Sequence, residues 1–249
     1  MNKEQYKKMM SVIIEKAPLE SGVQTLAYML IHEILENFPY DIVVVDNLSK
    51  QSRFASYSGM SDLAVVTPDF SYHGDKGRIE LCVEVKLPAV KFSNCEMQIM
   101  GQLLTFGKAV FTNGIMWEYY DIDSYIKKNS LDSIDETIGN HKYELLRKLV
   151  LSVTQNEREI VSLSRSISCY KRYKNTAAIN EAEKLIVEIK KEIEDTERRI
   201  KDMLTELQWL NDILFYPEWS VELYDCNDEF QAEKYSDLIV NLYSVFSVL

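Results

Sequence analysis

The sequence predicts an α/β protein with a mixed central sheet flanked by helices, into which a long helical hairpin is inserted. Three observations carry this prediction. Short β-prone runs over 62–66 and 80–86 have acids at their ends, and an Asn-Gly pair at 113–114 separates two more such runs. Between residues 146 and 214, apolar residues recur at spacings of three and four. The short runs are typical of strands and a hairpin, whereas the longer pattern is typical of packed helices.

After a first helix over 4–16, the elements of the predicted core follow one another in the order αβββαββ. The helices carry apolar residues on one side, and the strands are β-prone runs bounded by turn residues. Asn-Gly is a strong hairpin signal because both residues tolerate positive φ. In chain order, we expect helices over 4–16 and 20–37, strands over 41–46, 62–66 and 80–86, a helix over 94–108 and a hairpin over 111–120.

Residues 141–214 are predicted to form an antiparallel coiled-coil hairpin. Heptad-spaced apolar residues make its seam, Asn156 and Thr196 interrupt that seam, and a polar turn lies near 171–178. Polar residues at such positions fix the register of a coiled coil at some cost in stability. In the expected register, Ile167 faces Ile186, and Leu149 lies nearer Leu204 or Leu207.

After Pro217 the apolar period returns to two, and an amphipathic helix is expected over about 229–248. A strand and a helix of this kind need a core to pack against. We therefore predict three segments: an α/β core over 1–125, the hairpin insertion over 141–214, and a strand and helix over 216–249 that return to the core.

The composition of the chain excludes few classes of function. The chain has 249 residues and a net charge of −11, which argues against strong non-specific binding to DNA. A nuclease that uses a local basic patch or is delivered by a partner remains open, as does an acidic surface that imitates nucleic acid. The four cysteines include no Cys-x-x-Cys pair, and the three histidines have no metal-ligand spacing.

No apolar run reaches the ~20 residues that span a bilayer, and the N-terminus lacks the apolar core of a signal peptide. We therefore expect a cytoplasmic protein with no membrane partner.

The candidate site lies at the ends of two predicted strands. Asp62 opens the first strand, and Glu84 and Lys86 close the second. Residues two apart on a strand share a face, so Glu84 and Lys86 should project together. Two carboxylates and an ammonium at adjacent strand ends can hold a divalent metal and activate a water. The alternative is a surface ion pair between Glu84 and Lys86.

The order of these motifs resembles the PD-(D/E)xK nuclease superfamily, and is most similar to the N-terminal nuclease domain of type I restriction enzyme R (motor) subunits. The similarity covers roughly residues 18–122. Ser61 stands where the superfamily has Pro, and Phe106 where its glutamine motif has Tyr. No Gly-x-x-x-x-Gly-Lys-Ser/Thr phosphate loop is present, so no ATP-driven motor of that kind is expected in the chain. The matching residues are Asp62, Glu84, Lys86, Gln102, Thr112-Asn113-Gly114, Trp117 and Tyr120.

The resemblance implies a restriction-endonuclease-like core and a role for each site residue. Asp62 and Glu84, with the carbonyl of Val85, would bind Mg²⁺ or Mn²⁺, which prefer such oxygen ligands. Lys86 would orient or deprotonate the attacking water, and Gln102 would hold a water or phosphate beside the metal. Gln98 is the alternative to Gln102. Glu20 would complete the site, and Glu33 and Glu36 are the alternative acids for this role. The aromatic residues Trp117, Tyr119 and Tyr120 are instead expected to pack in the sheet.

The resemblance thus implies a magnesium-dependent endonuclease acting on DNA rather than RNA, in restriction or defence. Two alternatives remain at this point: an inactive nuclease-fold module for binding or assembly, and an acidic DNA-mimicking inhibitor. The hairpin offers a surface for a protein partner or for self-association. Its tip carries a basic cluster, Lys171, Arg172 and Lys174, which suits either a solvated turn or a contact to nucleic acid or a partner.

Overall fold

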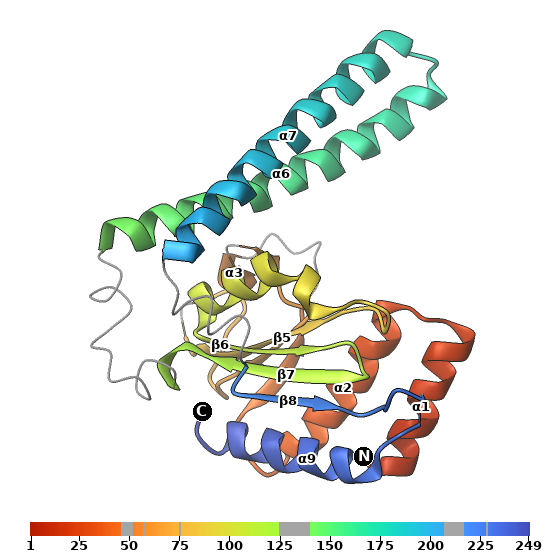
Figure 1. Ribbon diagram of the computed structural model, residues 1–249, viewed down its shortest axis with the longest axis vertical. Helices are drawn as coiled ribbons and strands as arrows, with labels where there is room; N and C mark the ends of the chain where they lie inside the picture. Colours follow the sequence, from red (N-terminus) through yellow and green to blue (C-terminus); the bar gives the residue numbers. More distant parts are fainter. Residues whose placement is uncertain (46–51, 57, 75, 125–139, 207–216, 228) are drawn as a thin grey trace. The chain divides into compact units, whose positions relative to one another are not determined.

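The computed structural model describes residues 1–45, 52–56, 58–74, 76–124, 140–206, 217–227 and 229–249 (Figure 1). The chain forms two compact units. The first contains Met1–Asn129 together with Asp212–Leu249, and the second contains Ser130–Asn211. In the described residues, no helix is both long enough and apolar enough to cross a membrane.

A six-stranded sheet forms the centre of the first unit. Its neighbouring strands are antiparallel except β5 and β6, which are parallel and are joined through the helix α3 (Glu96–Phe106). In spatial order the strands are β1 (Asp41–Val44), β4 (Leu63–Val66), β5 (Ile79–Val85), β6 (Lys108–Thr112), β7 (Met116–Asp121) and β8 (Trp219–Glu222). Two short strands, β2 (Ala55–Ser56) and β3 (Gly59–Met60), pair separately. The mixed α/β class with a central sheet flanked by helices is confirmed, whereas the short strands β2 and β3 were not predicted.

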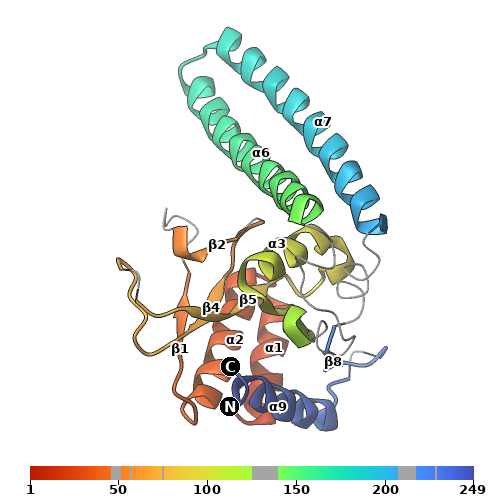
Figure 2. The same ribbon diagram turned by 90° about the vertical axis from the view of Figure 1, so that its left-hand side faces the viewer.

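Helices cover both faces of this sheet (Figure 2). The helices α1 (Lys3–Lys16), α2 (Glu20–Leu35) and α9 (Ala232–Phe246) share one apolar core with alternate residues of the strands, such as Leu81, Val83 and Val85. Because successive strand residues point to opposite faces, the intervening Cys82 and Glu84 face α3. This alternation places the polar residues of β5 beneath α3 and away from the main core.

The N-terminal helix is tied directly to the β6–β7 hairpin. Asn2 caps α1 in a reciprocal capping box with Gln5, which satisfies two free amide groups of the first turn. Further along α1, the Tyr6 hydroxyl donates to the carbonyl of Gly114 at 2.8 Å and accepts from the Trp117 indole at 2.9 Å. Gly114 has a φ of 81°, as the predicted Asn-Gly turn requires.

The strand that follows the second unit completes the sheet of the first. β8 pairs antiparallel with β7, with Trp117 opposite Val221, and α9 packs against the shared core. The sheet is therefore built from segments on both sides of Ser130–Asn211.

The second unit consists of two long helices that pack side by side. They are α6 (Asn140–Arg172) and α7 (Thr176–Glu206), and the three residues between them reverse the chain. Their buried residues recur at the predicted positions and include Leu146, Leu149, Val153, Ile167, Ala182, Ile189, Thr196 and Ile200. The expected proximity of Leu149 to Leu204 or Leu207 lies outside the residues whose side chains the structure describes, and the facing of Ile167 and Ile186 stays a prediction.

Candidate functional site

The side chains of Asp62, Glu84 and Lys86 come together at the neighbouring ends of β4 and β5. The antiparallel register sets Leu63 opposite Val83. Asp62, which directly precedes β4, therefore lies beside Glu84 near the end of β5. Asp62 Oδ2 accepts a hydrogen bond from the Val85 amide at 2.7 Å. Lys86 Nζ lies 2.5 Å from Glu84 Oε1, because residues two apart share a face of the strand.

Two glutamines of α3 hold the Glu84 carboxylate. Gln102 Nε2 donates to Glu84 Oε2 at 2.5 Å, and Gln98 Nε2 donates to Glu84 Oε1. Residues four apart on a helix lie on the same side, so both of the alternatives left open by the sequence reach the carboxylate. With Lys86, Glu84 therefore accepts from three side chains.

The thiol of Cys82 orients one of these glutamines. Cys82 Sγ donates to Gln102 Oε1 at 3.1 Å, which leaves the Gln102 amide nitrogen directed at Glu84. Sequence reasoning did not select Cys82. The available signal was its position two residues before Glu84, on the same face of the strand.

Close packing fixes α3 over the sheet. Ser58 Oγ donates to the carbonyl of Gln98 at 2.8 Å. Gly101 approaches Ser58 so closely that a Cβ on Gly101 would lie 2.4 Å from the Ser58 Cβ. The glycine therefore lets α3 sit near enough for both glutamines to reach Glu84.

The helix α2 contacts the site from the other side. Gln24 Nε2 donates to the carbonyl of Asp62 at 3.0 Å, and half-buried Glu20 lies one turn earlier on α2. The charge of Glu20 acts on the pKa values of both Asp62 and Lys86.

The two alternatives to Glu20 interact with another group. Glu33 pairs with the N-terminal ammonium, and the charge of Glu36 acts on the same ammonium. Gln24 was missed by sequence reasoning, although it shares a helix face with Glu20.

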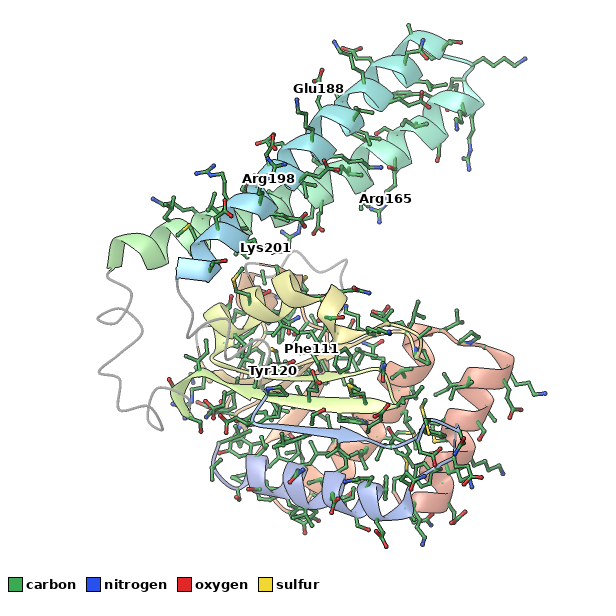
Figure 3. The ribbon with its side chains drawn as sticks, in the orientation of Figure 1. Phe111, Tyr120, Arg165, Glu188, Arg198 and Lys201 are labelled. Atoms are coloured by element: carbon green, nitrogen blue, oxygen red, sulfur yellow. The ribbon has the colours of Figure 1, made fainter. Side chains whose placement is uncertain are left out.

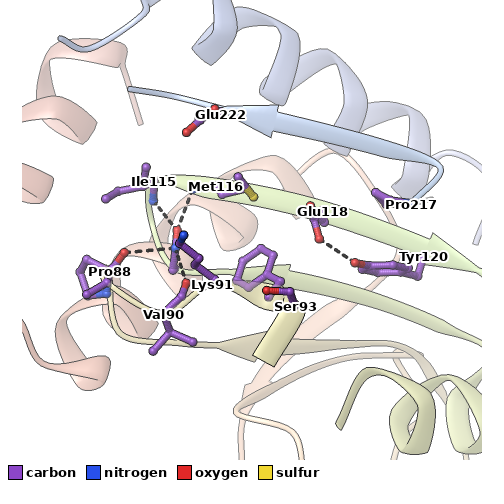
Figure 4. Close-up of a pocket in the computed structure, with 13 residues that line it drawn as sticks. Pro88, Val90, Lys91, Ser93, Ile115, Met116, Glu118, Tyr120, Pro217 and Glu222 are labelled. Carbon is purple, nitrogen blue, oxygen red and sulfur yellow. Dashed lines mark hydrogen bonds between the residues drawn. The ribbon is translucent and has the colours of Figure 1, made fainter. Parts of the chain in front are cut away.

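The Thr-Asn-Gly turn holds the backbone that follows Lys86. The Lys86 amide donates to the carbonyl of Thr112 at 2.8 Å. Asn113 Nδ2 donates to the carbonyls of Pro88 at 3.2 Å and Val90 at 3.0 Å, and its Oδ1 accepts from two amides of the turn. The bonds of Asn113 are drawn in Figure 4. The turn thus positions the end of the strand that carries Glu84 and Lys86.

Beside this turn lies a pocket of about 520 Å³ between the segment 88–93 and the strands β7 and β8 (Figure 4). Its lining includes Lys91, Glu118, Tyr120 and Glu222, with a hydrogen bond from the Tyr120 hydroxyl to Glu118. None of the five predicted site residues lines it, namely Asp62, Glu84, Lys86, Gln102 and Glu20, so the pocket is distinct from the carboxylate cluster.

The aromatic residues of β7 pack inside the protein. The side chains of Trp117, Tyr119 and Tyr120 are buried, and Tyr120 stacks edge-on against Phe111. The expectation that they pack in the sheet is confirmed.

Burial and mutual repulsion set the electrostatics of the cluster. Burial raises the pKa of Asp62, and the nearby Glu20 adds to this effect. Burial also raises the pKa of Glu84, and the Asp62 carboxylate raises it further. For Lys86, burial acts to lower the pKa, but the nearby carboxylates of Glu84, Asp62 and Glu20 together outweigh it and the pKa is raised. The cluster therefore places one lysine ammonium beside two buried carboxyl groups whose ionised forms repel each other.

This donor set fits a small divalent cation by its chemistry. The available ligands are the carboxylates of Asp62 and Glu84 and the carbonyl of Val85, and oxygen ligands suit Mg²⁺ and Mn²⁺. One ammonium balances only one of the two buried carboxylates, so a cation would relieve the remaining repulsion. In the part of the chain that the structure describes, no group of three or more His, Cys, Asp or Glu side chains is arranged to hold a metal.

Comparison of the chain with protein-family models found no match, and comparisons with curated proteins and with solved structures found none either. The proposed function therefore depends on the sequence motifs and on the geometry of the site.

Proposed function

We propose that this protein is a metal-dependent nuclease of the PD-(D/E)xK type, with a restriction-endonuclease-like core and a coiled-coil insertion. The observation that supports the proposal best is the convergence of Asp62, Glu84 and Lys86 at adjacent strand ends. Two carboxylates from separate strands, brought against one lysine, are the groups that hydrolysis of a phosphodiester needs. DNA is the proposed substrate.

Each residue has a role that follows from its surroundings. Asp62, Glu84 and the carbonyl of Val85 would hold Mg²⁺ or Mn²⁺. The chemistry that such a cation supplies when bound is a lower pKa for a water molecule and withdrawal of charge from the phosphate. Because the nearby carboxylates raise the pKa of Lys86, we propose that Lys86 orients the water and offsets phosphate charge rather than acting as a general base.

The glutamines act through Glu84. Both carboxylate oxygens accept from side-chain amides of α3, and Cys82 fixes the orientation of one of them. Gln98 and Gln102 are therefore proposed as positioning residues that hold the carboxylate in one rotamer. Glu20, which faces the cluster from α2, would add negative charge at its open side.

The same hydrogen bonds support a second candidate function. Glu84 is satisfied by three side-chain donors of the chain itself, so the network can also act as a polar clamp between α3 and the sheet. On that reading the protein is a nuclease-fold module for binding or assembly that has no catalytic activity.

Cleavage assays separate the two functions. Supercoiled plasmid and single-stranded DNA would be incubated with Mg²⁺, with Mn²⁺ or with EDTA. The nuclease proposal predicts metal-dependent cleavage by the wild type and losses of about 10²-fold or more in Lys86→Ala and Asp62→Asn.

Glu80→Gln provides the matched control. Glu80 is a buried acid of the same strand, but it pairs with Arg78 rather than with the cluster, so this variant should keep its activity. Absence of cleavage by the wild type with either metal would favour the binding module. Equal cleavage by wild type and Asp62→Asn would assign the activity to a contaminant.

A further inference from the structure

Positive charge is concentrated on one helix of this acidic protein. The helix α6 has seven basic and three acidic residues, a net charge of +4, although the whole chain carries −11. The helix α7 has six basic and nine acidic residues, a net charge of −3. The two helices of the pair therefore present surfaces of opposite sign.

Three arginines form a straight row on α6. Arg158, Arg165 and Arg172 are exposed and recur every seven residues, which keeps them on one side of a helix that packs against a neighbour. Successive members are about 10.5 Å apart along the axis at 1.5 Å per residue. Arg165 comes two residues before buried Ile167, a turn of about 200° around the helix. Figure 3 shows Arg165 projecting from the side of α6 away from α7.

No acid lies three or four positions from any member of this arginine row. The helix-surface neighbours of a residue are three and four positions away. For the arginine row these neighbours are Thr154, Gln155, Val161, Ser162, Ser168, Cys169, Asn175 and Thr176. The three arginines form no ion pair with any residue that the structure describes. The charge of the row is thus free to meet an external anion.

The helix α7 carries a similar row whose charge is neutralised. Lys184, Lys191 and Arg198 also recur every seven residues and are exposed, but each has at least two acids three or four positions away. Lys184 pairs with Glu188 at 3.7 Å, and Arg198 pairs with Asp195 at 3.3 Å. Glu188 and Arg198 are labelled along α7 in Figure 3. Spacing alone therefore does not distinguish the arginine row; the absence of acids three or four positions away does.

We propose that the arginine row of α6 binds the sugar-phosphate backbone of nucleic acid. Guanidinium groups bind phosphates through paired hydrogen bonds and keep their charge at every physiological pH. A straight row of such groups fits an extended polyanion better than a single phosphate. The exposed Lys171 and Lys174 extend the positive surface to the turn at the end of the hairpin. The inference deepens the proposed function, and it rests on that function for the choice of nucleic acid as the polyanion.

The other polyanionic partners fit less well. A helix that binds a membrane surface needs a free apolar face, and the apolar face of α6 is already buried against α7. The acidic side of α7 in a second copy of the chain is an electrostatic partner as well, and self-association is therefore one outcome that the test must detect.

The test measures binding without cleavage. Full-length protein would be titrated into a short fluorescently labelled DNA duplex in EDTA, and the affinity followed by anisotropy over a range of salt concentrations. The variant Arg158→Gln/Arg165→Gln/Arg172→Gln is compared with the matched control Lys184→Gln/Lys191→Gln/Arg198→Gln. Each variant removes three positive charges at the same spacing and takes the net charge from −11 to −14.

The slope of log affinity against log salt is negative, and loss of the arginine row should reduce its magnitude by about 2.7, which is about 0.9 for each of three phosphate contacts. The α7 control should keep the wild-type slope. Between about 50 and 200 mM salt, the wild type should then lose about 40-fold more affinity than the α6 variant does. Circular dichroism should show equal helix content in both variants.

Three outcomes would overturn the inference: no binding by the wild type at low salt, equal losses in the two triple variants, or an α6 variant that changes only the molar mass in light scattering. The last result would identify the row as a self-association surface. Because the titration contains EDTA and measures binding without cleavage, its result does not depend on whether Asp62, Glu84 and Lys86 form a catalytic site.

Discussion

Replacing Asp62 by Asn removes one of two buried, repelling carboxylates and keeps the shape of the side chain. The Asn side-chain oxygen can still accept the hydrogen bond that Asp62 Oδ2 accepts from the Val85 amide at 2.7 Å. We therefore expect this variant to be more stable than the wild type when no divalent metal is present.

The size of the effect follows from the pKa of Asp62. Burial raises this pKa from 3.8 to about 6, and each unit corresponds to about 1.4 kcal/mol of free energy that the ionised form costs the folded state. Because the ionisation of Asp62 is coupled to that of the neighbouring Glu84, we expect Asp62→Asn to raise the free energy of unfolding by about 1–3 kcal/mol at neutral pH. For a domain of this size each kcal/mol shifts Tm by about 2–4 °C.

Thermal unfolding in EDTA measures the gain, and Glu84→Gln provides the contrast. Both oxygens of Glu84 accept hydrogen bonds from Lys86, Gln98 and Gln102, so a glutamine there must turn its amide group toward a donor. Glu84→Gln should therefore lower Tm despite removing the same charge. A Tm of Asp62→Asn at or below that of the wild type would refute the claim that repulsion between buried carboxylates strains the metal-free site.

Three further predictions concern pH, the turn and the hairpin. The pKa values of Asp62 and Glu84 are raised to about 6 and about 8, so the folded state binds protons more tightly than the unfolded state. The metal-free protein should therefore lose stability as pH rises from about 4 to about 8. Over the same interval the Tm advantage of Asp62→Asn should grow from zero near about pH 4. Asn113→Ala, which breaks the bonds to the carbonyls of Pro88 and Val90, should cost about 1–3 kcal/mol in chemical unfolding, and an unchanged midpoint would show that the turn does not hold this segment. Asn156→Leu should raise the stability of the helical pair by about 1 kcal/mol or more, because the Asn156 amide nitrogen is buried and has no hydrogen-bond partner among the described residues; a lower Tm in circular dichroism would contradict this.

The sequence predicts most elements because their signals are local. Helical and strand periodicity located α1, α2, β5 and the β6–β7 hairpin to within a few residues. The sheet order is less accessible, because the pairing of β8 with β7 joins residues about a hundred positions apart. Alternation along a strand reveals which residues share a face but not which strand lies beside it.

The same distinction applies to the site. Asp62, Glu84 and Lys86 could be selected because each ends or opens a strand with a recognisable pattern. The choice between Gln98 and Gln102 could not be made, since residues four apart lie on one helix face and both reach Glu84. Gln24 and Cys82 were missed because their roles depend on which helix packs over which strand end, and that is decided by tertiary packing.

The location of a bound cation tests the central claim most directly, since the claim is that Asp62 and Glu84 bind one metal together. Crystals soaked in Mn²⁺ and measured for anomalous scattering would locate the ion. We expect a single strong peak at about 2.0–2.3 Å from both carboxylates, as is usual for hard divalent cations with oxygen ligands, and no peak there in Asp62→Asn. A peak elsewhere, or none beside these carboxylates at millimolar Mn²⁺, would contradict the metal-dependent nuclease and favour the polar clamp.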